Sequence, residues 1–89
     1  MKNKIALESL SMDLKRVALG YNRGSDKMAM RFSEEAKIRK NEINVDEVSH
    51  YIRKLLSSLD KILNGDNKTL ISENALMYST LFQNYSRLL

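Results

Sequence analysis

Apolar residues recur along most of the chain at alternating intervals of three and four positions, with polar residues between them. This spacing places an apolar stripe along one side of a helix, and no segment shows the period of two that is typical of a strand. Glycine and asparagine interrupt the pattern around residues 20–24, 41–44 and 64–67, and such residues mark turns. The pattern therefore predicts four amphipathic helices.

The first predicted helix covers residues 3–20 and the second covers residues 26–42. Between them, Gly20 or Gly24 can take the left-handed conformation that ends a helix, and Ser25 can cap the next one. The apolar seam of the first helix consists of Leu7, Leu10, Leu14, Val17 and Tyr21. The second has a thinner face, which makes it the weakest of the four predicted elements. That face consists of Met28, Ala29, Phe32, Ala36 and Ile43.

The third predicted helix covers residues 45–64 and has the broadest apolar face. Its start is predicted from Asn44 and Glu47, which have the spacing of a capping box. Its seam consists of Val48, Ile52, Leu55, Leu59 and Ile62, widened by Tyr51, Leu56 and Leu63. Because this face is wider than the ~100° that one neighbour covers, we expect the third helix to contact two others and to form the centre of the bundle.

The fourth predicted helix follows the turn at residues 64–67 and continues to about residue 88, with Thr69 or Ser72 as its cap. Its seam consists of Ile71, Ala75, Tyr78, Phe82, Tyr85 and Leu89. Short connections force consecutive helices to run antiparallel. We therefore predict an all-α fold, a small antiparallel up-down bundle of four helices that forms one domain over residues 1–89. Without the break near Asn44 it would be a three-helix bundle.

The composition excludes several classes of chemistry. The chain has no cysteine, which excludes disulfides and thiolate catalysis and fits a reducing compartment. It also has no phosphate-binding loop and no dinucleotide fingerprint. The basic residues at positions 2 and 4 are followed by only three apolar residues, too few for a signal peptide. No stretch approaches the ~18 apolar residues of a membrane span. We therefore expect a soluble cytoplasmic protein that does not associate with membranes.

The single histidine, His50, lies three positions after Glu47, which is the Glu-x-x-His spacing used by metal-binding helical bundles. Such a site needs two copies of the motif and two further glutamates, and only a homodimer could supply the second copy here. On a helical wheel both residues lie opposite Ile52 and Leu59, so His50 is expected to face solvent. We predict no catalytic residue, metal, cofactor or small-molecule substrate. An enzyme with an intersubunit metal site remains an alternative.

Several apolar residues lie outside the predicted seams. Ile5, Met12 and Leu19 recur at intervals of seven, nearly opposite the seam of the first helix. Three such residues form a stripe that usually meets a partner, whereas isolated exposed apolar side chains are normal. Further apolar residues of this kind are Met30, Ile38 and Leu76. We hypothesise that these residues contact a second copy or another protein; the alternative is that steeply crossing helices bury the stripe within one chain.

A mild excess of basic residues supports a second hypothesis. The net charge is +4, with 15 basic and 11 acidic residues spread along the chain. Arg31 in the second predicted helix and Arg53, Lys54 and Lys61 in the third could together follow a phosphate backbone. Because the outer face of the third helix has no asparagine or glutamine to read bases, sequence-specific DNA binding is not expected.

The leading interpretation is therefore a non-catalytic protein that acts through protein-protein interaction, as a homodimer or a subunit of a larger assembly. The alternative is a nucleic-acid-associated helical protein that uses its basic helix face. The sequence contains no signal for the biological process or for the identity of the partner.

Overall fold

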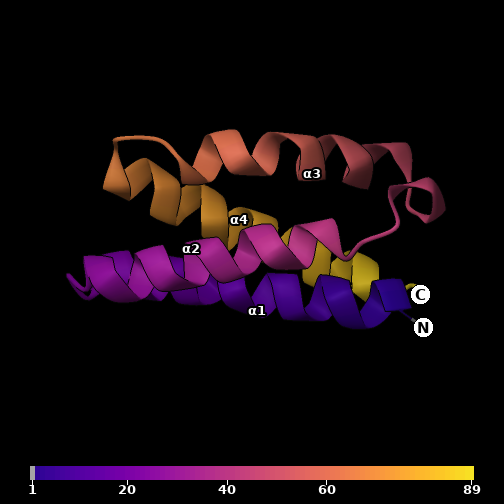
Figure 1. Cartoon of the computed structure of the whole chain (residues 1–89), viewed down its shortest axis with the longest axis horizontal. Coiled ribbons are helices and arrows are strands. Elements are labelled where there is room, and N and C mark those ends of the chain that lie inside the picture. The colour runs from indigo at the N-terminus through magenta and orange to yellow at the C-terminus, as the bar shows by residue number, and fades with distance from the viewer. Residues whose placement is uncertain (1) are drawn as a thin grey trace.

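The computed structural model describes residues 2–89, which form four α-helices joined by short connections. Successive helices run in opposite directions, so that both ends of the chain lie at the same end of the bundle (Figure 1). No strand occurs within residues 2–89. The predicted antiparallel bundle of four helices is therefore confirmed. The elements are α1 (Lys2–Asn22), α2 (Asp26–Asn41), a short 3-10 helix η1 (Val45–Glu47), α3 (His50–Leu63) and α4 (Lys68–Ser86).

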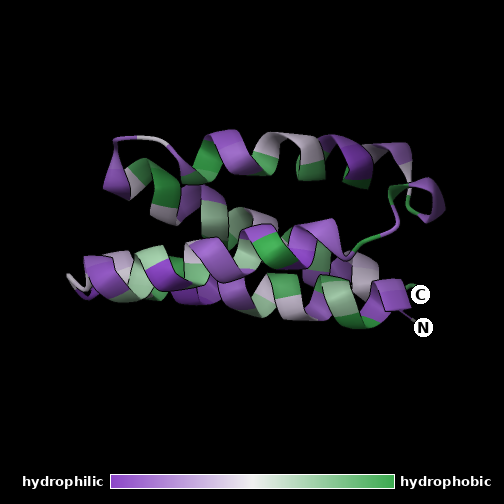
Figure 2. Ribbon diagram, in the orientation of Figure 1, coloured by the Kyte–Doolittle hydropathy of each residue, from purple (hydrophilic) through white to green (hydrophobic). Residues whose placement is uncertain are grey.

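Residues from all four predicted seams form one continuous hydrophobic core. Figure 2 shows that the hydrophobic residues of α3 lie on the side that faces the other helices. The largest apolar side chains that are fully buried are Leu7, Leu10, Leu14, Val17, Ile52, Leu56, Leu59 and Phe82.

The helix at the centre of this core is α1, which packs against both α2 and α4. It approaches them closely because small residues line the contacts: Ser11 and Ala18 face α4, and Gly20 faces α2. The ribbon of α3 stands further from the others (Figure 1), and the residues that it buries are the larger leucine and isoleucine. Ten residues of α1 are buried, against four of α3. The prediction that the third helix forms the centre is therefore wrong.

The contact between α1 and α4 includes a reciprocal pair of buried serines. The Ser11 hydroxyl donates to the backbone carbonyl of Ser79 at 3.0 Å, and the Ser79 hydroxyl donates to the carbonyl of Ser11 at 2.7 Å. Two turns further along α1, the Ser72 hydroxyl of α4 donates to the carbonyl of Ala18 at 3.3 Å. A short side chain reaches a carbonyl of another helix only when the two backbones are close, so these serines set the spacing of α1 and α4.

The two glycines at the end of α1 serve different purposes. Gly24 lies in the turn with φ of 76°, a left-handed conformation that glycine adopts without steric cost. Gly20 lies inside α1, where a Cβ atom would come within 2.7 Å of the backbone nitrogen of Ala29 in α2.

Ser25 caps α2 as predicted, accepting a hydrogen bond from the Met28 amide at 3.4 Å. The thin face predicted for the second helix is confirmed, since α2 buries only Ala29, Ser33 and Ala36.

The start predicted for the third helix is wrong. It begins at His50 instead of residue 45, and the Ser49 hydroxyl caps it by accepting a backbone hydrogen bond at 3.3 Å. Asn44 caps η1, and Val48 is extended with its side chain in the core. The reason is a tertiary contact, because the Asn3 side chain of α1 accepts from the Asn44 amide at 2.9 Å and donates to its carbonyl at 3.0 Å.

Two further details differ from the sequence prediction. The fourth helix begins at Lys68 with Asn67 as its cap, whereas Thr69 and Ser72 were expected to fill that role. Tyr51, which was placed in the apolar face of the third helix, is 56% exposed. That face is wider than the surface that α2 and α4 cover, so its edge remains in contact with solvent.

Candidate interaction surface

The outward side of α1 carries the predicted stripe of Ile5, Met12 and Leu19, called the α1 stripe below. These side chains are 64%, 53% and 38% exposed. A spacing of seven residues is about two helical turns, so neighbouring members lie roughly 10 Å apart along one line. The opposite side of α1 is packed against α2 and α4. The alternative that crossing helices bury the stripe within the chain is therefore wrong.

Charged residues border the α1 stripe along one flank. Ser11 and Ala18 mark the edge of α1 that meets α4, because both form hydrogen bonds with that helix. Around α1, Glu8 and Lys15 lie between this edge and the α1 stripe. Both side chains are exposed, and neither forms an ion pair within residues 2–89. Their charges are therefore free to meet a partner at this flank.

The other flank of the α1 stripe faces α2 and contains Ser9 and Arg16. The Arg16 guanidinium lies 5.3 Å from the centre of the Phe32 ring of α2, within the range of a cation-π contact. At the N-terminal end, Ile5 borders a groove between α1 and α2. The groove is lined by Lys2, Ile5, Ala6, Ser9, Arg39 and Glu42.

The remaining predicted interface residues are exposed but do not all join the α1 stripe. Leu76 lies on α4 between Ser72 and Ser79, which both bond to α1, so it borders the same side of the bundle. Met30 lines a hollow between α2 and α3 together with Leu63. Ile38 lies on the outer side of α2. The structure therefore brings Leu76 to α1 and leaves Met30 on another side.

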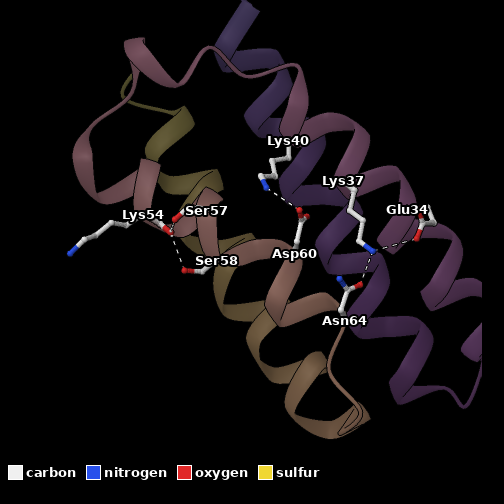
Figure 3. Close-up of polar contacts among 8 residues, drawn as sticks. All are labelled: Glu34, Lys37, Lys40, Lys54, Ser57, Ser58, Asp60 and Asn64. Atoms are coloured by element: carbon white, nitrogen blue, oxygen red, sulfur yellow. Dashed lines mark hydrogen bonds and ion pairs between the residues drawn. The ribbon is translucent and has the colours of Figure 1, made fainter.

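The predicted basic residues do not form one surface. Arg53, Lys54 and Lys61 are exposed on the outer side of α3, and in Figure 3 the Lys54 side chain points away from the bundle. Arg31 lies over the Phe32 ring, 5.6 Å from its centre, on the side of α2 that meets α1. The structure therefore does not bring Arg31 together with the three residues of α3.

The side of α2 that meets α3 carries other lysines, which have acceptors on α3. Lys37 donates to Asn64 at 2.7 Å, and Lys40 pairs with Asp60 at 3.2 Å (Figure 3). Asp60 therefore pairs with a residue of α2, and Arg53, Lys54 and Lys61 have no ion-pair partner within residues 2–89.

Among the described residues, no group of three or more histidine, cysteine, aspartate or glutamate side chains could hold a metal ion. His50 and Glu47 are both exposed, as the helical wheel predicts.

One acidic residue of the described chain, Asp13, is buried, at the contact between α1 and α2. Burial raises the pKa of its carboxyl group above the ordinary value, and the nearby Arg39 opposes that shift. Asp13 Oδ2 and Arg39 Nε lie 3.9 Å apart, and each lacks a hydrogen-bond partner within residues 2–89. Only the Asp13 side of this pair is buried, because Arg39 is 38% exposed, lines the groove beside Ile5 and also pairs with Glu42 at 3.2 Å.

A second line of exposed apolar residues, on α4, was not predicted from the sequence. Leu70 and Met77 of α4 are about half exposed and, like members of the α1 stripe, are seven positions apart. Leu70 lines a hollow between α3 and α4 beside Ile62 and Ile71. The same spacing of seven would have identified this pair, since both residues lie outside the seam of the fourth helix.

Comparison of the chain with models of protein families, with curated proteins and with solved structures finds no match. Among the helices described for residues 2–89, none combines the length and apolar character that a membrane crossing requires.

Proposed function

We propose that this protein has no catalytic activity and acts by binding another protein through the α1 stripe. The observation that carries this proposal is the exposure of Ile5, Met12 and Leu19 in one line on a helix whose other side is fully packed. Scattered exposed apolar residues need no explanation, but three exposed apolar residues aligned on one side of a helix are typical of an interface.

The energetics also favour association. Fully burying a leucine, isoleucine or methionine side chain contributes roughly 1.5–3 kcal/mol. A bundle of 89 residues buries a smaller share of its surface on folding than a larger domain does, so an added interface extends its core. The absence of cysteine fits a reducing compartment, and we propose that the protein works in the cytoplasm as a homodimer or a subunit of a larger assembly.

A charged substitution in the α1 stripe tests this function. Met12→Glu places a carboxylate at the centre of the stripe, while Ser57→Glu adds the same charge on the exposed side of α3 and serves as the control. The readouts are the mass in solution at micromolar concentration and the proteins captured from the native cell. We expect association to be lost in Met12→Glu and kept in Ser57→Glu. Equal mass and equal capture for both variants and the unmodified protein would contradict the proposal.

A nucleic-acid-associated role is the second candidate, supported by the exposed Arg53, Lys54 and Lys61 on one side of α3. Cations that follow a phosphate backbone give an affinity that falls steeply with salt. A mobility shift on nucleic acid that disappears with salt and in an Arg53→Glu, Lys54→Glu double variant is the expected result for this role. The absence of any shift at low salt would exclude it.

A further inference from the structure

We propose that the partner of the α1 stripe is the same stripe of a second copy, packed antiparallel with Met12 at the two-fold axis. This inference rests on the proposed function and deepens it by naming the partner. A two-fold interface uses the same surface on both copies, so that surface must be complementary to itself when reversed. Apolar and charged positions of α1 both meet this condition.

The apolar positions are symmetric about Met12. Ile5 lies seven residues before it and Leu19 lies seven residues after it. Antiparallel pairing about Met12 therefore places Ile5 opposite the second copy's Leu19, and Met12 opposite its own counterpart. Every exposed apolar residue of the α1 stripe then meets an apolar residue.

The charged positions distinguish the antiparallel from the parallel arrangement. Glu8 and Lys15 share one flank of the stripe, four residues before and three residues after Met12. In an antiparallel pair the two-fold axis lies in the interface, perpendicular to both helices. The flank with Glu8 and Lys15 therefore faces the same flank of the second copy, and Glu8 lies nearly level with the second copy's Lys15. The symmetry repeats this pairing, which gives two contacts between opposite charges. On the other flank, Ser9 lies nearly level with the second copy's Arg16.

A parallel pair of α1 helices would bring the two different flanks together. Lys15 would then lie beside the second copy's Arg16, and these like charges repel each other. Glu8 would lie beside Ser9 and have no basic partner. Charge complementarity therefore favours a second copy in the antiparallel orientation.

Leu76 of α4 fits the same arrangement. It lies between Ser72 and Ser79, which contact Ala18 and Ser11, so it is within about one helical turn of the level of Met12. The two-fold axis places α4 of both copies on the same side of the interface. Leu76 therefore adds an exposed apolar residue close to the axis, beyond the flank that contains Glu8 and Lys15, whereas Met30 belongs to the side of α2 that meets α3.

Single cysteines test the orientation directly because the chain contains none of its own. A disulfide requires Cα atoms about 4.4–6.8 Å apart. Met12→Cys is expected to form a covalent dimer under mild oxidation, and so is a mixture of Ile5→Cys with Leu19→Cys. Ile5→Cys alone is not, since fourteen residues, or roughly 21 Å of helix, separate its two copies. Ser57→Cys on α3 measures random oxidation and should remain monomeric on a denaturing gel.

Charge reversal provides a second readout that does not depend on oxidation. Glu8→Lys and Lys15→Glu should each weaken self-association on the order of tenfold, because each creates two contacts between like charges. The double variant should restore it. Neither residue has an ion-pair partner within residues 2–89, so thermal unfolding of the diluted variants should match that of the unmodified protein.

Several outcomes would overturn the inference. Cross-linking of Ile5→Cys alone, or tighter association of Lys15→Glu, would show the parallel arrangement. A monomeric unmodified protein at micromolar concentration, or dimers unaffected by either charge reversal, would also refute it. The proposed function has a different test. It is contradicted when Met12→Glu changes neither the mass in solution nor the proteins captured from the cell.

Discussion

The carboxylate of Asp13 on α1 and the guanidinium of Arg39 on α2 form an ion pair at 3.9 Å, too far for a hydrogen bond. The Asp13 side chain is only 10% exposed. Burial raises the pKa of Asp13, Arg39 and Arg16 lower it, and Glu35 raises it further. A buried carboxylate without a hydrogen bond costs stability, and Arg39 is 38% exposed and also pairs with Glu42 at 3.2 Å, so the ion pair offsets little of the cost of burying Asp13.

The raised pKa of Asp13 predicts how stability depends on pH. A carboxyl group with a higher pKa in the folded state binds protons more readily there than in the unfolded chain. The stabilising contribution from its protonation is therefore present below the unfolded pKa and is lost as pH rises through the folded pKa. Asp13→Asn removes the charge, and we expect its free energy of unfolding at pH 7 to exceed that of the unmodified protein by about 1 kcal/mol.

The measurement is urea unfolding of both proteins between pH 3 and pH 8, with Glu73→Gln, an exposed acid on α4, as the control. The difference between Asp13→Asn and the unmodified protein should grow as pH rises. A difference that is constant with pH, or a less stable Asn variant at pH 7, would show that burial does not dominate at Asp13.

Removing the reciprocal serine pair should weaken the contact of α1 with α4. Ser11→Ala loses one buried hydrogen bond, which typically costs about 1 kcal/mol. Ser11→Val also inserts bulk between two closely spaced helices and should cost about 1–3 kcal/mol. Because Ser11 and Ser79 form one network, the double alanine variant should lose less than the sum of the two single variants.

The matched control for the serine pair is Ser57→Ala, since the Ser57 hydroxyl is exposed and bonds only to the Lys54 carbonyl of its own helix (Figure 3). Urea unfolding should show a change within about 0.5 kcal/mol for this variant. If Ser11→Val is as stable as Ser57→Ala, the spacing of α1 and α4 is not set by small side chains.

Gly20→Ala should destabilise the protein, although alanine normally favours a helix interior over glycine by about 1 kcal/mol. The added Cβ would lie 2.7 Å from the backbone nitrogen and 2.9 Å from the Cα of Ala29, so α1 and α2 must separate. We expect a net loss of about 1–3 kcal/mol in thermal or urea unfolding. At Gly65 a Cβ would meet its nearest atoms at 3.7 Å, so Gly65→Ala should be nearly neutral. Equal stability of the two variants would contradict this account.

The start of α3 makes a further prediction. Ser49→Ala removes the cap of α3 and should cost about 1 kcal/mol, with faster amide exchange in its first turn. Asn44→Ala leaves the first turn of α3 unchanged, because the Asn44 side chain caps η1 and the contact from Asn3 uses the Asn44 backbone. Amide exchange by nuclear magnetic resonance compares the two variants. Faster exchange at Ile52 in Asn44→Ala, with unchanged exchange there in Ser49→Ala, would contradict this account.

The sequence by itself determined the number of helices, their antiparallel order and most of the core. These features depend on local periodicity, because residues three and four positions apart share one side of a helix wherever that helix is placed. The seam residues Leu10, Leu14 and Leu59 are fully buried for this reason. The exposure of Met12 follows from the same geometry, since it lies across α1 from that seam.

Only the tertiary structure decided which helix lies at the centre, where α3 begins and which cations lie together. Helix spacing depends on the size of side chains that face each other, and Ser11 and Gly20 carry little hydrophobic signal although they let α1 approach its neighbours. The start of α3 depends on Asn3, which is distant in sequence from Asn44. Periodicity within one helix contains no information about such partners, and it equally does not determine what covers the α1 stripe.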